Sequence, residues 1–171
     1  MLSTTGQAEV KIRDVRPGRR VLPPATCNAI LRDDLFLGDK TGRVYQIEVK
    51  KGRVAEVFKD DKPSPINCMF AALGFVWTGH EDALIRQWTI QTGDKFREMK
   101  GHRGSILSLA IMGKSLFSGS QDGFIYQWDL VTGDGCNFMP MTRPVLCLAV
   151  WPSAELLIAG DMNGRMVYWD T

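Results

Sequence analysis

The stretch that decides the fold is GHRGSILSLAIMGKSLFSGSQDGFIYQWDLVTG, residues 101–133. Apolar residues alternate with small or polar ones along ILSLAI, SLFSGS and FIYQWDL, and this period of two is typical of β-strands. The junctions QDG (121–123) and TGD (132–134) contain a glycine, which supplies the positive φ that tight hairpins require. The stretch therefore predicts antiparallel strands joined by short turns.

The same pattern recurs along the chain with a period of about 41 residues. Trp88, Trp128 and Trp169 are 40 and 41 residues apart, and 41 residues before Trp88 comes Ile47, inside the alternating segment RVYQIEV. A glycine precedes each of these four positions by nine residues: Gly38, Gly79, Gly119 and Gly160. Another glycine follows the first three by five residues: Gly52, Gly93 and Gly133. Chance does not keep so many residues in phase, so the chain contains four internal repeats.

Each repeat is expected to form four strands. In the second repeat they are INCMFAAL, GFVWTG, ALIRQWTI and KFREMK, and no segment of the chain has a convincing helical period. The predicted fold class is all-β, with four-stranded units at residues 26–60, 65–100, 105–140 and 145–171. Residues 1–25 are predicted to form a basic arm with a candidate strand, QAEVKIRDV, at 7–15.

The third repeat resembles the WD-repeat family, because it has Gly101-His102 at its start, SGSxD at its middle and Trp128-Asp129 near its end. The resemblance implies a β-propeller in which each repeat is one blade. It also implies a hydrogen-bonded tetrad of His102, Ser118, Asp122 and Trp128, in which the indole N–H, the hydroxyl, the imidazole and the carboxylate satisfy one another.

The other repeats depart from this pattern. The second keeps Thr78, Asp82 and Trp88 but has Lys59-Asp60, or residues close to it, where Gly-His is expected. The fourth has Asn163 and Trp169-Asp170 without a preceding histidine, and the first has Thr41 and Ile47 at the aspartate and tryptophan positions. Alternation and glycine turns are expected to suffice for these blades.

The ring is expected to be unfinished, since propellers have about four to eight blades and the fourth repeat lacks a fourth strand. Three arrangements stay open. The chain is a fragment of a longer protein, or two copies form an eight-bladed ring in which segment 7–15 of each completes the fourth blade of the other, or it closes alone as a small four-bladed ring.

Composition and charge limit the classes of function. The formal net charge is +2, with 21 basic and 19 acidic residues, so net charge gives no support to nucleic-acid binding. Neither a secretory signal nor a membrane span is predicted. Cys27, Cys68 and Cys147 fall at one recurrent position, which predicts a small buried side chain there. We therefore expect no metal, no cofactor and a cytoplasmic protein, with the nucleus as the alternative.

Catalysis is not expected. Of the two histidines, His102 is assigned to the tetrad, and His80 is predicted to lie on the surface in the turn GHED. No nucleophile or phosphate-binding motif is present. The turn aspartates look architectural rather than like paired catalytic carboxylates: Asp39, Asp82, Asp122 and Asp161.

The predicted function is that of a scaffold or adaptor that binds a peptide or protein on the propeller rim within a larger complex. The predicted partner-binding rim consists of Lys40, Glu81, Gln121, Met162, Arg103 and Arg143. The segment CNFMPMTRP (136–144) is expected either at an interface or between blades. The alternative is a ribonucleoprotein subunit whose basic N-terminal arm contacts RNA, in which case affinity would fall steeply with added salt.

Overall fold

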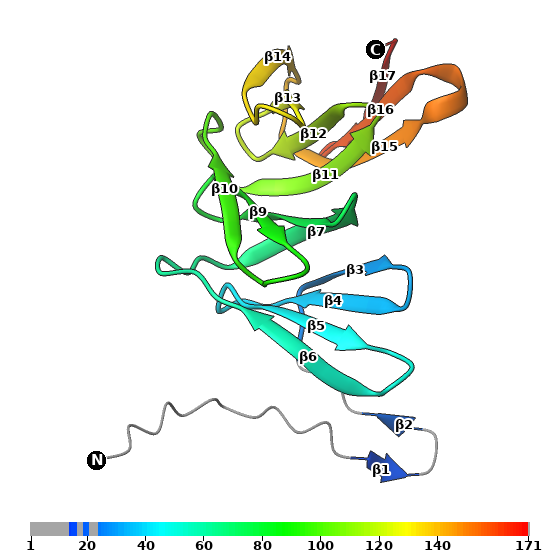
Figure 1. Ribbon diagram of the computed structural model, residues 1–171. Helices are drawn as coiled ribbons and strands as arrows, with labels where there is room; N and C mark the ends of the chain where they lie inside the picture. Colours follow the sequence, from blue (N-terminus) through cyan, green and yellow to red (C-terminus); the bar gives the residue numbers. More distant parts are fainter. Residues whose placement is uncertain (1–13, 17–18, 21–23, 171) are drawn as a thin grey trace.

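The computed structural model describes residues 14–16, 19–20 and 24–170 of the chain (Figure 1). Most of the predicted strand 7–15 lies outside the described residues. A short antiparallel hairpin, β1 (Asp14–Arg16) and β2 (Arg19–Arg20), lies at one end of the molecule. Four antiparallel sheets follow it along an open arc, which bears out the all-β propeller prediction.

Each sheet comes from one repeat and is called a blade here. Blade 1 contains β3 (Cys27–Leu31), β4 (Asp34–Gly38), β5 (Val44–Glu48) and β6 (Arg53–Phe58). Blade 2 contains β7 (Ile66–Ala72), β8 (Phe75–His80), β9 (Ile85–Thr89) and β10 (Lys95–Met99). Blade 3 contains β11 (Ile106–Met112), β12 (Ser115–Ser120), β13 (Phe124–Asp129) and β14 (Gly135–Pro140). Blade 4 contains β15 (Val145–Trp151), β16 (Leu156–Asp161) and β17 (Met166–Asp170).

Within a blade the strands are paired in sequence order, so each blade is a simple meander. The first strands of successive blades lie beside one another, β3 against β7, β7 against β11 and β11 against β15. These four strands therefore form the inner side of the arc. The described residues do not close into a ring, and blade 4 has three strands where the others have four.

The blades pack through apolar faces that alternate with the period of the strands. Phe36, Val44 and Phe58 of blade 1 meet Ile66 and other apolar residues of blade 2. Equivalent clusters join blades 2 and 3 around Trp77 and Ile106, and blades 3 and 4 around Phe117 and Val145. Side chains that bury large apolar areas in this way supply most of the stabilisation.

The phased glycines allow this close packing. A methyl group added at Gly79 would lie 2.5 Å from Cγ2 of Ile106 in the next blade and 2.6 Å from the sulfur of Cys68. Gly38 and Gly119 have the same surroundings, with Ile66 and Val145 from the following blade. The first aliphatic residue of each following blade therefore fits against a glycine of the preceding one.

Blade 4 confirms one sequence-based expectation, a turn at WPSAE, and contradicts another. The segment WPSAE contains a single 3-10 turn, Pro152–Ala154, which carries the two extra residues of the fourth repeat within the β15–β16 hairpin. Cys147 packs against Gly160, as Cys68 does against Gly79, but it is exposed. The prediction that this position is buried is wrong for Cys147, because no described residue covers that face of blade 4, and Cys27 and Cys68 are only partly buried.

Candidate functional site

The four tetrad residues of blade 3 are joined by hydrogen bonds. Nε1 of Trp128 donates to Oγ of Ser118 at 2.8 Å, and Oγ of Ser118 lies 2.8 Å from Nε2 of His102. Nδ1 of His102 donates to Oδ2 of Asp122, also at 2.8 Å. The ring of Tyr126 stacks against the histidine, with 4.2 Å between ring centroids. These polar groups satisfy one another and fix the packing of the blade.

Blade 2 makes the same chain of bonds with a histidine from another place. Nε1 of Trp88 donates to Oγ1 of Thr78 at 2.8 Å, and Oγ1 of Thr78 lies 2.7 Å from Nε2 of His80. Nδ1 of His80 donates to the carbonyl oxygen of Ser64 at 2.8 Å. The prediction of a surface histidine is therefore wrong, because β8 extends to His80 and buries its side chain completely.

Burial keeps both histidines neutral. It lowers the pKa of His80 to about 4, and the bond to the Ser64 carbonyl opposes this only in part. Burial also lowers the pKa of His102 more than the Asp122 carboxylate raises it. A neutral ring with its proton on Nδ1 leaves Nε2 free to accept from the hydroxyl. Each histidine is thus fully occupied within its blade, which leaves neither one available as a catalytic base in this arrangement.

A buried ionic cluster lies beside the blade 2 tetrad. The Arg86 guanidinium pairs with both oxygens of Asp82, at 3.1 and 2.6 Å, and with Asp60, whose side chain is 1% exposed. Nζ of Lys95 lies 2.7 Å from Asp60 and 2.9 Å from Glu98. Burial alone would raise the pKa of Asp60, but the Lys95 hydrogen bond and the Arg86 charge outweigh it, so its pKa lies below the usual value.

The turn aspartates do not form one equivalent set. Asp39 and Asp161 directly follow the phased glycines, and the Oδ1 atom of each accepts backbone N–H groups of its own turn, from Thr41 and Arg43 and from Asn163 and Arg165. Asp82 and Asp122 lie two positions later in their repeats and bind Arg86 and His102. All four carboxylates therefore have structural partners.

Among the described residues, no group of three or more histidine, cysteine, aspartate or glutamate side chains is placed to hold a metal ion. In the same part of the chain, no helix has the length and apolar character needed to cross a membrane.

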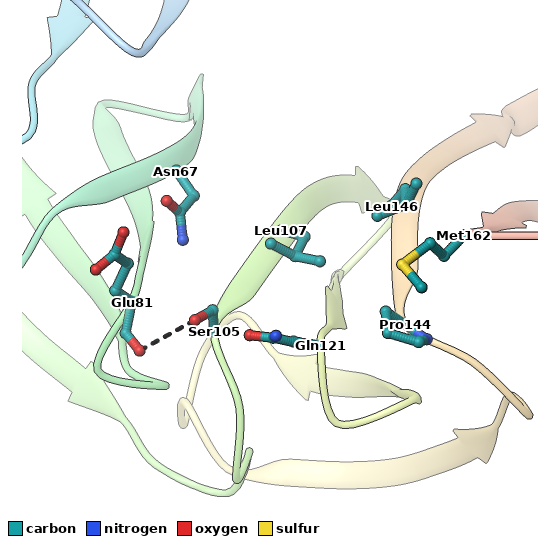
Figure 2. A pocket seen from close by; sticks show the side chains of 8 residues that line it. All are labelled: Asn67, Glu81, Ser105, Leu107, Gln121, Pro144, Leu146 and Met162. Carbon is teal, nitrogen blue, oxygen red and sulfur yellow. Dashed lines mark hydrogen bonds between the residues drawn. The ribbon is translucent and has the colours of Figure 1, made fainter.

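A groove of about 320 Å³ runs across the inner ends of blades 2, 3 and 4 (Figure 2). Three of the predicted rim residues, Glu81, Gln121 and Met162, contribute to its wall. They occupy equivalent turns between the second and third strands of their blades. The remaining lining residues come from the start of each first strand or directly before it: Asn67, Ser105, Leu107, Pro144 and Leu146. We call this set of eight residues the inner groove.

The inner groove changes in character along its length. At the blade 2 end lie Asn67 and Glu81, and at the blade 4 end lie Pro144, Leu146 and Met162. Figure 2 shows the blade 3 residues between these two ends, with Ser105 bonded to the Glu81 carbonyl oxygen at 3.3 Å. One end is therefore acidic and polar, and the other is apolar.

The three other predicted rim residues do not line the inner groove. Lys40, Arg103 and Arg143 are exposed, and the backbone N–H of Arg103 donates to the tetrad carboxylate of Asp122. Sequence reasoning had also missed the first-strand residues Asn67, Leu107 and Leu146. Each directly precedes the recurrent cysteine position, at Cys68, Ser108 and Cys147, so the repeat phase could have identified them.

Solved structures with the same fold support the propeller assignment. The computationally designed Ika4 protein matches with a TM-score of 0.78 and 21% identity, over 86% of this chain and 91% of that chain. The RRP9 WD40 repeats match with a TM-score of 0.79 and 21% identity, over 85% and 48%. A chain of the Mitotic Checkpoint Complex matches with a TM-score of 0.81 and 15% identity, over 90% and 51%. The chain thus spans about half the length of the last two.

Comparison of sequences gives the family. No curated protein sequence matches the chain. The family model described as the IP5P C-F beta-propeller matches residues 36–136, from the second strand of blade 1 to the last strand of blade 3. This match covers more than half of the sequence and includes both histidine-containing blades. On this evidence the chain belongs to the IP5P C-F beta-propeller family, and its repeats are of the WD type.

Proposed function

We propose that this chain is a protein-interaction scaffold that binds a peptide, or a loop of a protein partner, in the inner groove as part of a larger complex. The observation that carries the proposal is which parts of the fold supply the residues that line the groove. Equivalent positions of three consecutive blades supply its walls, and their side chains do not take part in the packing clusters between the blades. Concave surfaces with a few placed polar groups are the usual sites of ligand binding.

The polar residues fall into two groups, those bonded within the blades and those free at the groove, and this supports the proposed function. The histidines, the tetrad hydroxyls and the turn aspartates are all bonded within their blades. In contrast, the side chains of Glu81 and Gln121 make no hydrogen bond or ion pair with any described residue. They are exposed at the groove and keep their full capacity to bind a partner.

The RNA-contact alternative depends on the basic arm at residues 1–25. Most of that arm lies outside the described residues, and its described arginines belong to the β1–β2 hairpin at the blade 1 end of the arc. No structural observation favours RNA over a protein partner, so it is not proposed as a second function. The test below distinguishes the two through salt dependence, since phosphate contacts weaken steeply as salt is added.

The test uses a double variant, Leu107→Asn with Met162→Gln. Each substitution copies a side chain that already occupies the equivalent position of another blade, Asn67 and Gln121, so the blades are expected to fold. Val131→Glu is the matched control, because Val131 is 74% exposed and lies in a turn between third and fourth strands. Circular dichroism and the thermal midpoint check that all three proteins are folded.

Affinity purification followed by mass spectrometry then compares the proteins retained by the wild type and the two variants. We expect partners that the wild type and Val131→Glu retain and the double variant loses, at low and at moderate salt. A second double variant, Lys40→Glu with Arg103→Glu, tests the rim outside the inner groove. Equal retention by the groove variant, or retention only of nucleic acid that salt releases, contradicts the proposal.

A further inference from the structure

We propose that the inner groove takes an extended peptide with one lysine or arginine side chain at the Glu81 end and one apolar side chain at the Leu146 and Met162 end. This inference rests on the proposed function and adds the chemistry and the direction of the ligand. Three features of the described residues carry it: an unpaired acid at one end, exposed apolar side chains at the other, and free amide groups along the way.

The acid at the blade 2 end is available for a cation. Glu81 is the only charged residue among the eight that line the inner groove. Its neighbour Asp82 is neutralised by Arg86, which binds both carboxylate oxygens. His80, on the other side, is buried and bonded to Thr78 and Ser64, so it supplies no compensating charge. The Glu81 carboxylate therefore has no cation of its own in the described part of the chain, and a basic side chain complements it.

The blade 4 end suits an apolar side chain. Leu146 is 47% exposed and Met162 is 60% exposed, and Figure 2 shows them close together above Pro144. Leu107 lies between this pair and the acidic end, so the apolar surface continues into the middle of the groove. Methionine is unbranched and polarisable, which lets it adapt to aliphatic side chains of different shape.

The middle of the inner groove can bind a peptide backbone. In the middle, the Gln121 amide has both donors and an acceptor free. At the blade 2 end, the Asn67 amide spends one donor on the Ile106 carbonyl oxygen at 3.1 Å and keeps its other donor and its oxygen. An amide that both donates and accepts matches the alternating N–H and C=O groups of an extended chain. A volume of about 320 Å³ lies at the small end of the range for ligand sites, so the groove accommodates a short segment of chain.

The test measures binding of short synthetic peptides to the purified full chain by fluorescence anisotropy. The peptides have a Gly/Ser/Ala background and blocked ends, and carry one Lys or Arg and one Leu or Met at varied separations. Matched peptides replace the basic residue by Glu or the apolar residue by Ala. We expect the peptides with both residues to bind best, and either replacement to weaken binding by about tenfold, which is a change of about 1.4 kcal/mol.

Charge variants then assign the two ends. Glu81→Gln should remove the preference for Lys over Glu, and Glu81→Lys should reverse it. Glu56→Gln, on the exposed face of β6 in blade 1, is the control and should leave the preference unchanged. Met162→Gln should remove the preference for Leu or Met over Ala while the preference for Lys persists.

The outcomes that overturn this inference differ from those that overturn the proposed function. Peptides that bind through the apolar residue alone, or a charge preference that Glu81→Lys leaves unchanged, contradict the assigned chemistry while the groove remains a binding site. The assigned chemistry is also wrong, and the groove remains a binding site, if no peptide of the set binds but the groove double variant still loses its protein partners. If neither peptides nor partners respond to the groove variants, both proposals are wrong.

Discussion

Thr78 and His80 lie two residues apart on β8, and Oγ1 of Thr78 is 2.7 Å from Nε2 of His80. In blade 3 the corresponding contact joins Ser118 to His102, which comes from the connection before β11 and is 16 residues away. The order of bonds is nevertheless the same in both blades. The indole N–H donates to a hydroxyl, the hydroxyl contacts Nε2, and Nδ1 donates to an oxygen. The blade therefore requires an imidazole at a fixed place in the structure, and this imidazole can come from different positions in the repeat.

Replacing Thr78 by valine should destabilise the protein by about 2 kcal/mol. Valine keeps the shape of threonine but leaves the N–H of Trp88 and Nε2 of His80 without a partner in a buried site. The control is Thr142→Val at an exposed position, for which we expect a change close to zero. Urea unfolding, followed by tryptophan fluorescence, measures both. Equal stability of the two variants would show that the hydroxyl does not hold the blade together.

The protein should lose stability in mild acid. The pKa of His80 falls from an ordinary 6.5 to about 4 on folding, so between these values the unfolded chain binds a proton that the folded chain does not. With respect to His80, the free energy of unfolding is therefore highest above pH 6.5 and decreases as the pH falls toward 4. This decrease amounts to roughly 3 kcal/mol if His80 acts alone. The lowered pKa of His102 also reduces stability as the pH falls. Carboxylates whose pKa is lowered by folding, such as Asp60, extend the loss of stability to pH values below the ordinary carboxylate pKa.

His80→Gln isolates this effect, because glutamine can still donate and accept hydrogen bonds but does not titrate. Its stability at neutral pH is expected to be lower than that of the wild type. Its dependence on pH between 6.5 and 4 should be shallower, since one of the two buried histidines is gone. Chemical unfolding at a series of pH values gives both slopes. Parallel curves for the two proteins would mean that His80 is not the residue responsible.

Substitution of the phased glycines tests the packing between blades. Gly79→Ala should cost about 1–3 kcal/mol, because its methyl group meets Ile106 of blade 3 as well as Cys68. Gly160→Ala should cost less, since only the sulfur of Cys147 lies near its added methyl group. The two substitutions are chemically identical, so the difference in thermal midpoint reports the neighbouring blade. A larger loss at Gly160 than at Gly79 would contradict the packing described above.

The blades were predictable because their signals are local and repeated. Alternation sets the buried face of each strand, and glycines such as Gly79 and Gly119 mark where the next blade comes close. His80 was missed because the expected pattern placed the histidine before the first strand of the blade. Residues two apart on a strand share a face, and this rule, applied to Thr78, would have directed attention to His80.

The inner groove was predictable only in part. Glu81, Gln121 and Met162 were found because turn positions follow the repeat. Lys40 was assigned to the rim by the same turn position, and Arg103 and Arg143 by their place in the connecting loops, but neither criterion indicates which side chains line one groove. Which side chains line the groove depends on how neighbouring blades lie against one another, and the sequence of a single repeat does not indicate this.

Substitution of Arg86 tests the feature by which blade 2 differs from its neighbours. Tyrosine occupies the equivalent position in blades 1 and 3, as Tyr45 and Tyr126. Blade 4 has Val167 there. In blade 2, Arg86 pairs with Asp60 and Asp82. Arg86→Met should cost about 3 kcal/mol, because the Asp60 carboxylate stays buried with Lys95 as its main remaining partner. Arg53→Met should change stability by less than about 1 kcal/mol, because the Arg53 side chain is 63% exposed beside Glu48.

Adding Asp60→Asn to Arg86→Met should restore part of the lost stability, because it removes the charge that the first substitution leaves uncompensated. Asp60→Asn alone should destabilise, since it leaves Arg86 with one carboxylate fewer in a site that is almost completely buried. The four proteins form a double-mutant cycle, and urea unfolding gives the coupling energy directly. If the two losses simply add, Arg86 and Asp60 act independently, and their ion pair does not hold the cluster together.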